Sequence, residues 1–280
     1  MTSVLQAPVP HASEPSPSAF CDGGIEARIP ALIRSHPAAY AVFFDIDGTL
    51  LDIAGKPDEI IVPHGLPEAL AKLQDMLGGA LALVTGRGMD FADQLFAPFR
   101  FPLAGLHGAE RRDAGQNLTR AEPTAAFLDA KAYLQHMAEE LPGILIEDKG
   151  AAIAAHYRHA PALADELEKL MNDVLARCGK RYALQAGKMV MEIRPAGASK
   201  GSAVDAFLAM EPFLGRVPIA FGDDLTDEAM FDAVNRKGGI SVHIGSKGER
   251  ETRATHRLAD PQAVRRLVFA ATSANPPPNG

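Results

Sequence analysis

Short apolar runs alternate along this chain with longer segments in which apolar residues recur at helical spacing. Most of the runs are too short for helices and have the Val, Leu, Ile and Phe content of buried strands: 41–44, 80–84, 103–105, 218–221 and 240–244. Helices are predicted between several of these strands, over 66–77, 200–210 and 227–234. Strands and helices in alternation indicate an α/β fold with a parallel sheet.

The stretch from 119 to 194 has a different order of elements. A helix and two strands are predicted there, followed by a second helix and two more strands: 124–140, 144–147, 151–157, 161–178, 181–185 and 189–194. This order predicts a separate α+β domain. It would be an insertion, so the first domain would consist of residues 39–118 and 195–272.

Both ends of the chain lack a periodic apolar pattern. Residues 1–24 are rich in Pro, Ser and Ala, which predicts a flexible tail. We expect residues 1–38 to form this flexible extension and a lead-in to the first strand. Residues 273–280, with three consecutive prolines, are predicted to be a disordered tail.

The composition narrows the class of protein. The chain has 280 residues and a net charge of −7, and it shows no basic patch of the kind that binds nucleic acid. Two cysteines cannot build a disulfide framework. No apolar stretch is long enough to span a membrane, and residues 1–18 do not have the pattern of a secretory signal. We therefore expect a cytoplasmic protein that contacts neither membrane nor nucleic acid.

Two carboxylates follow the first predicted strand, in the run Phe43-Phe44-Asp45-Ile46-Asp47-Gly48-Thr49-Leu50. Because Asp45 and Asp47 are two residues apart, they extend the same side of the strand end and can converge on one cation and one substrate. Oxygen ligands suit Mg²⁺, and an aspartate can also be a covalent nucleophile. The alternative is an ordinary Asp-Gly turn.

Two further segments are typical of anion binding. Thr85-Gly86-Arg87 follows the second strand and offers a hydroxyl and backbone N–H groups; the alternative is a helix N-cap and a turn. Lys200 is at the start of a predicted helix, where the helix dipole disfavours a cation. Its position therefore indicates a nearby anion, although a solvated surface lysine is the simpler interpretation.

An acidic cluster follows the strand 218–221. The segment Gly222-Asp223-Asp224-Leu225-Thr226-Asp227-Glu228 offers carboxylates for Mg²⁺, or an acidic capping box at a helix start. Asp223 lies too early for a capping role, and adjacent aspartates repel each other unless a cation is near. The cluster therefore favours a metal site.

In this order, the four segments resemble the haloacid dehalogenase superfamily of phosphohydrolases, over residues 41–245. The resemblance implies a Rossmann-like core with an inserted α+β cap domain. It also implies that Asp45 attacks phosphorus, that Asp47 is the general acid and base, and that Thr85 and Lys200 hold the phosphoryl oxygens. Mg²⁺ would be bound by Asp45, Asp223 and the backbone carbonyl of Asp47, with Asp224 and Asp227 in indirect roles.

A narrower resemblance is to trehalose-6-phosphate phosphatases. Besides the segments above, it rests on the runs 105–110, 147–150, 156–158 and 188–195. It implies a cap domain over residues 119–194 in which four side chains hold the glucose hydroxyls: Glu147, Lys149, Lys188 and Glu192. Gly86, Arg87 and His107 would line the cleft from the core. Without the resemblance, solvated cross-strand pairs are the simpler interpretation of the cap lysines and glutamates.

The implied activity is Mg²⁺-dependent hydrolysis of trehalose 6-phosphate through an aspartyl-phosphate, the last step of trehalose biosynthesis. Functional coupling to a trehalose-phosphate synthase would follow from that role. The alternatives are another capped sugar phosphatase, for sucrose 6-phosphate or mannosyl-3-phosphoglycerate, or a non-catalytic sugar-phosphate sensor. A degenerate sensor would be expected to lose at least one of the residues in the set, and all are present: Asp45, Asp47, Thr85, Lys200 and Asp223.

Overall fold

The central element of the fold is an eight-stranded sheet in the order β12-β11-β10-β1-β2-β3-β4-β5. The computed structural model describes residues 23–53, 59–187, 189–246 and 251–273. Six neighbouring strands are parallel: β12 (His256–Leu258), β11 (Ile240–Ile244), β10 (Val217–Gly222), β1 (Tyr40–Phe44), β2 (Leu81–Val84) and β3 (Leu103–Gly105). β4 (Glu110–Arg112) and β5 (Leu118–Arg120) continue the sheet in antiparallel fashion.

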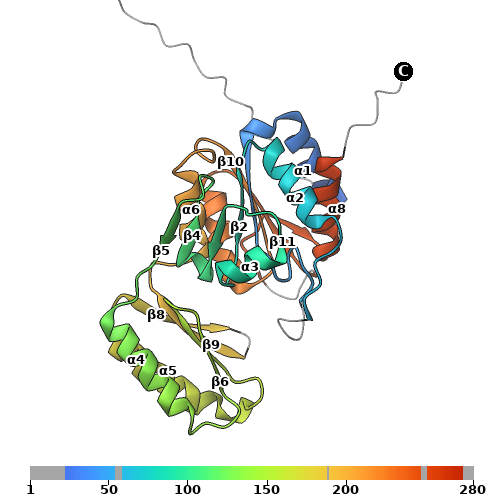
Figure 1. Cartoon of the computed structure of the whole chain (residues 1–280). Coiled ribbons are helices and arrows are strands. Elements are labelled where there is room, and N and C mark those ends of the chain that lie inside the picture. Colours follow the sequence, from blue (N-terminus) through green and yellow to red (C-terminus); the bar gives the residue numbers. More distant parts are fainter. Residues whose placement is uncertain (1–22, 54–58, 188, 247–250, 274–280) are drawn as a thin grey trace, which may run out of the picture.

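Helices cover the sheet in two groups. One group packs together from distant parts of the chain: α1 (Gly23–Ser35), α2 (Leu66–Met76) and α8 (Pro261–Thr272). The other pairs α6 (Lys200–Leu208) with α7 (Glu228–Arg236). From β1 the chain moves to β2 in one direction, and from β10 it moves to β11 in the other, so right-handed crossovers place α2 and α7 on opposite faces. Figure 1 shows these two groups on the two sides of the sheet.

β1 occupies the middle of the sheet because its residues are apolar on both faces. Val42, Phe43 and Phe44 are fully buried, and the Phe44 ring stacks on Phe221 of β10 with centroids 4.8 Å apart. The Asp45 N–H continues the ladder by donating to the Phe221 carbonyl oxygen at 3.0 Å. The first carboxylate is therefore held at the carboxyl edge of the sheet, where open α/β sheets bind ligands.

The inserted domain has a sheet and a hydrophobic core of its own. Its antiparallel sheet has the order β6-β7-β9-β8, and its core includes Phe127, Leu134 and Ile153. The elements are α4 (Ala125–Ala138), β6 (Leu145–Asp148), β7 (Ile153–His156), α5 (Ala164–Cys178), β8 (Tyr182–Gly187) and β9 (Val190–Pro195). Figure 1 shows α4 and α5 on the side of this small sheet away from the core domain, so its other face turns toward the core domain.

The structure differs from the sequence analysis mainly near domain boundaries. Residues 23–35, expected to be part of a flexible extension and lead-in, form α1, because Ile25, Ile29 and Ile33 repeat at helical spacing and are buried. The elements α3 (Met89–Leu95), β4, β5, β12 and α8 were not predicted. Residue 119 lies in β5 of the core sheet, so the insertion begins after Arg120.

Candidate active site

Lys200 and two carboxylates form a buried network at the carboxyl edge of the central sheet. The Lys200 ammonium lies 2.7 Å from Asp45 Oδ1 and 2.7 Å from Asp227 Oδ1. All three side chains are at most 5% exposed. Burial by itself would lower the pKa of Lys200, but the charges of Asp227 and Asp45 outweigh burial and raise it. Lys200 is therefore a cation, and the predicted surface lysine alternative is wrong.

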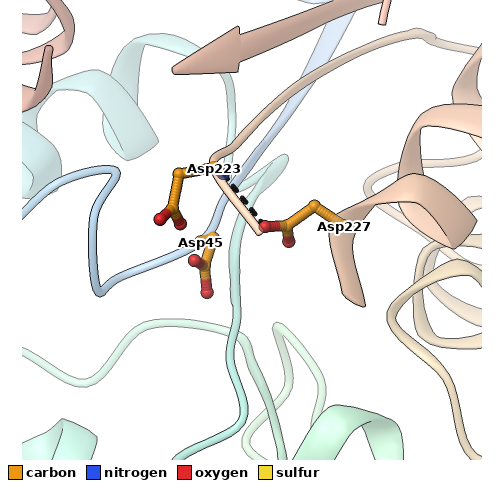
Figure 2. Close-up of side chains that lie close together, drawn as sticks. All are labelled: Asp45, Asp223 and Asp227. Carbon is orange, nitrogen blue, oxygen red and sulfur yellow. Dashed lines mark hydrogen bonds between the residues drawn. The ribbon is translucent and has the colours of Figure 1, made fainter. Parts of the chain in front are cut away.

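Asp45, Asp223 and Asp227 bring one oxygen atom each within 4.8 Å of one another (Figure 2). Burial raises the pKa of Asp45, against the opposing charge of Lys200, and burial with the charge of Asp227 raises the pKa of Asp223 to about 7. Asp223 Oδ1 is buried and has no hydrogen-bond partner among the residues that the structure describes. Repelling carboxylates with an unpartnered oxygen are an environment that a divalent cation would stabilise, so these residues fit Mg²⁺.

Asp227 organises this cluster from the start of α7. Its Oδ2 accepts hydrogen bonds from the backbone N–H groups of Asp223 and Asp224, at 3.0 and 2.9 Å, and its Oδ1 accepts from Lys200. Figure 2 shows the first of these contacts as a dashed line. Asp227 therefore has both oxygens engaged, which fits the indirect role that the sequence analysis gave it and favours Asp45 and Asp223 as direct ligands.

The segment after β2 lies against the turn after β3. The Thr85 Oγ1 accepts from the Arg87 N–H at 3.1 Å, and the Thr85 carbonyl oxygen accepts from the His107 N–H at 2.9 Å. A Cβ at Gly86 would lie 2.6 Å from the His107 ring, so only glycine fits this contact. Burial first, and then the charges of Lys200, Arg194 and Lys149, lower the pKa of His107 to about 3. His107 is therefore neutral at physiological pH.

The predicted sugar-binding residues of the cap form one polar cluster. Lys149 Nζ lies 2.9 Å from Glu192 Oε2 and 3.8 Å from Glu147 Oε2. Within the described part of the chain, Glu192 Oε1 is buried without a hydrogen-bond partner. His156 Nε2 lies 2.9 Å from Glu147 Oε2, a contact that the sequence analysis did not assign. Lys188, the fourth predicted cap residue, lies outside the described residues.

A cavity of about 220 Å³ opens between the two domains, with His107 and Lys200 on the core side and Gln185 and Arg194 on the cap side. The Arg194 Nε donates to Gln185 Oε1 at 2.6 Å, while its Nη1 is buried and has no partner in the described ranges. Sequence reasoning missed both cap residues. The available signal was spacing, because Arg194 follows Glu192 by two residues on a strand and so lies on the same face.

The family model described as trehalose-phosphatase matches residues 43–262. The chain belongs to this family. It is 54% identical over 236 residues to a probable trehalose-phosphate phosphatase of Sinorhizobium fredii, covering 84% of this chain and 89% of that protein. It is 47% identical over 223 residues to a trehalose-6-phosphate phosphatase of Escherichia coli, covering 79% of this chain and 82% of that protein.

The fold is similar to a solved structure, the C-terminal domain of a Candida albicans trehalose-6-phosphate phosphatase. The TM-score is 0.74 at 24% sequence identity, over 88% of this chain and 96% of that domain. The predicted resemblance to this family is thus confirmed, as is the fold class, a mainly parallel α/β core sheet with a separate antiparallel sheet.

Proposed function

We propose that this chain hydrolyses trehalose 6-phosphate to trehalose and inorganic phosphate, as the last step of trehalose biosynthesis. The observation that carries the proposal is the buried Asp45–Lys200–Asp227 network at the carboxyl edge of the core sheet, below a cap that presents Glu147, Lys149 and Glu192. Membership of the trehalose-phosphatase family favours this ester over sucrose 6-phosphate and mannosyl-3-phosphoglycerate.

In the first step, an oxygen of Asp45 attacks phosphorus and the bond to the sugar oxygen breaks. Asp47 gives its proton to that oxygen, so trehalose leaves as a neutral alcohol and Asp47 becomes a carboxylate. In the second step, the Asp47 carboxylate takes a proton from water as the water oxygen attacks the aspartyl-phosphate. Phosphate leaves, and Asp45 is again a free carboxylate.

Other core residues hold the phosphoryl group in this scheme. Lys200 is a buried cation beside Asp45, and the Thr85 hydroxyl and the Gly86 N–H would be further donors, since the Thr85 and Arg87 N–H groups donate to the Ala104 carbonyl oxygen and to Thr85 Oγ1. Mg²⁺ would be held by Asp45, Asp223 and the backbone carbonyl of Asp47, with Asp224 and Asp227 in support. When bound, it would supply positive charge for the phosphoryl oxygens.

The cap would recognise the sugar through charged hydrogen-bonding groups. A disaccharide presents many hydroxyls and little apolar surface, and hydrogen bonds to charged groups are the stronger kind. Glu147, Lys149, Lys188 and Glu192 are the proposed cap ligands, and Glu192 Oε1 is buried with no hydrogen-bond partner among the described residues. Gly86, Arg87 and neutral His107 would line the cleft from the core.

Three further expectations concern the location and the partners of the protein. Among the described residues, no helix is long and apolar enough to cross a membrane. The cytoplasmic location, the absence of nucleic-acid binding and the functional coupling to a trehalose-phosphate synthase stay predictions. Cell fractionation tests the first, an electrophoretic shift with DNA and RNA the second, and co-purification with a synthase the third.

The deciding experiment measures phosphate release from trehalose 6-phosphate, sucrose 6-phosphate, glucose 6-phosphate and p-nitrophenyl phosphate, with Mg²⁺ and with EDTA. We expect strong, Mg²⁺-dependent preference for trehalose 6-phosphate. Preference for another sugar phosphate would keep the catalytic core and discard the roles given to the cap residues. No turnover of any ester would instead favour the non-catalytic sensor.

A further inference from the structure

Arg87 donates two hydrogen bonds to the carboxylate of Asp47. Its Nε donates to Oδ2 at 2.6 Å, and its Nη2 donates to Oδ1 at 2.7 Å. Both side chains are partly exposed, at 25% and 32%. A planar guanidinium that binds both oxygens fixes the plane of the carboxylate as well as its distance, which a lysine cannot do. The proposed acid–base residue is therefore oriented by a partner 40 positions away in the sequence.

Arg87 is itself held firmly. Its backbone N–H donates to Thr85 Oγ1, and its carbonyl oxygen accepts from the Leu106 N–H at 3.0 Å. Its guanidinium lies 4.5 Å from the centroid of the Phe91 ring. The segment that supplies the proposed phosphoryl donors therefore also fixes the group that holds Asp47. Because of this shared anchor, the phosphoryl donors and the acid–base carboxylate would keep one relative geometry.

The charge of Arg87 also acts on a cap residue. The hydrogen bond from His156 is the main reason why the pKa of Glu147 is lowered, and the charges of Lys149 and Arg87 contribute. The charge of Arg87 thus influences Glu147, which is one of the proposed sugar ligands. Since Nε and Nη2 each donate to Asp47, the guanidinium keeps further N–H groups for other acceptors.

We propose that Arg87 is the positioning residue for the acid–base carboxylate Asp47, and that it acts on the leaving-group step in addition to any contact with the sugar. This inference rests on the proposed function, because it assumes that Asp47 protonates the leaving oxygen. In that step the Asp47 proton moves to the sugar oxygen as its bond to phosphorus breaks. The pair seen in the structure contains the carboxylate form of Asp47, which is the form that remains after this transfer.

The test compares leaving groups that carry no sugar. We would measure kcat and KM for p-nitrophenyl, phenyl and ethyl phosphate with the wild type, Asp47→Asn, Arg87→Ala, Arg87→Lys and the double variant Asp47→Asn/Arg87→Ala. A p-nitrophenolate leaves without a proton, whereas ethanol needs one. General acid catalysis contributes about 10² to 10⁴-fold, so Asp47→Asn should lose at least that much more kcat on ethyl than on p-nitrophenyl phosphate.

For Arg87→Ala we expect a similar but smaller dependence on the leaving group. Its kcat on ethyl phosphate should fall by about 10- to 10²-fold more than its kcat on p-nitrophenyl phosphate. Arg87→Lys should recover little of this loss, because one ammonium cannot fix both oxygens. In the Asp47→Asn background, Arg87→Ala should add less than about threefold, since residues that act as a unit are not additive.

Activity on p-nitrophenyl phosphate shows that each variant is folded, and a matched control is Arg236→Ala, which removes an exposed arginine that pairs with Asp205. Arg236→Ala should match the wild type on every ester. If Arg87→Ala raises only the KM for trehalose 6-phosphate and leaves the leaving-group dependence unchanged, Arg87 is a sugar ligand and the inference is overturned. If Asp47→Asn itself shows no leaving-group dependence, the acid–base assignment in the proposed function fails instead.

Discussion

The core and the cap both carry clusters of opposite charges, but they hold them in different surroundings. In the core, Asp45, Lys200 and Asp227 are at most 5% exposed and satisfy one another across three separate elements. In the cap, Glu147 and its partner His156 are 49% and 37% exposed, although the neighbouring Lys149 and Glu192 are only 16% and 9% exposed. Buried charge fixes one geometry and is costly to disturb, whereas exposed charge can exchange its partners for a ligand. From this difference we expect chemistry in the core and recognition in the cap, with Glu147 as the cap charge that is most accessible to a ligand.

The largest effect should come from the nucleophile. Asp45→Asn removes the attacking carboxylate and should lower kcat by about 10⁴-fold or more on every ester, including p-nitrophenyl phosphate. Single-turnover phosphate release and acid trapping of the phosphoenzyme measure it. Normal turnover by the Asp45→Asn variant would refute the assignment of Asp45 as the nucleophile. It would then no longer be justified to assign the chemistry to the core and the recognition to the cap.

Removal of the buried cation should damage the fold as well as the activity. Lys200→Met leaves the carboxylates of Asp45 and Asp227 buried without their partner, which should cost about 3–5 kcal/mol in the free energy of unfolding. Arg177→Met in the cap, which breaks an exposed pair with Asp173, should cost about 1 kcal/mol or less. Urea unfolding compares the two variants, and equal costs would erase the contrast between core and cap.

Substitutions in the cap should separate recognition from chemistry. Glu192→Ala or Glu147→Ala should raise the KM for trehalose 6-phosphate by about 10- to 100-fold, because each removes hydrogen bonds from a charged group. Both variants should spare p-nitrophenyl phosphate, which does not reach the sugar ligands. An equal loss on the two substrates would show that these residues support the core and do not recognise the sugar.

The smallest effect should be on stability in acid. The pKa of His107 is about 3 in the folded chain and near 6.5 when unfolded, so between these values the unfolded state binds more protons. The contribution of neutral His107 to the free energy of unfolding is thus complete above about pH 6.5 and is lost as the pH falls toward 3.

We expect His107→Asn to weaken this acid dependence, and asparagine tolerates the positive φ of 55° at this position. Urea unfolding at pH 5 and pH 8 measures this difference between the wild type and His107→Asn.

Lys149 of the cap is one of the charges that lower the pKa of His107, so Lys149→Met should raise that pKa slightly in an NMR titration. No change would mean that the cap charge does not reach the core cleft.

Some elements could be predicted because their burial is visible in the residue pattern. β3 and β11 have the predicted bounds, and each predicted strand and helix of the insertion is present within a few residues. β5 was missed because all three of its residues are exposed and so carry no apolar pattern. α1 was missed because its isoleucines follow directly on a Pro- and Ser-rich stretch that dominates the composition of this end.

The residue pattern was enough to predict the chemical types of the site: aspartates, a hydroxyl and a lysine at the ends of apolar strands and at a helix start. It was enough because charged side chains beside buried strands are costly unless they have a ligand or a partner. Which of these side chains contact one another became clear only from the three-dimensional fold. Asp227 engages Lys200 and the loop amides, and Arg87 orients Asp47 across 40 residues. Such pairings arise from the order of strands in the sheet, which local residue patterns do not encode.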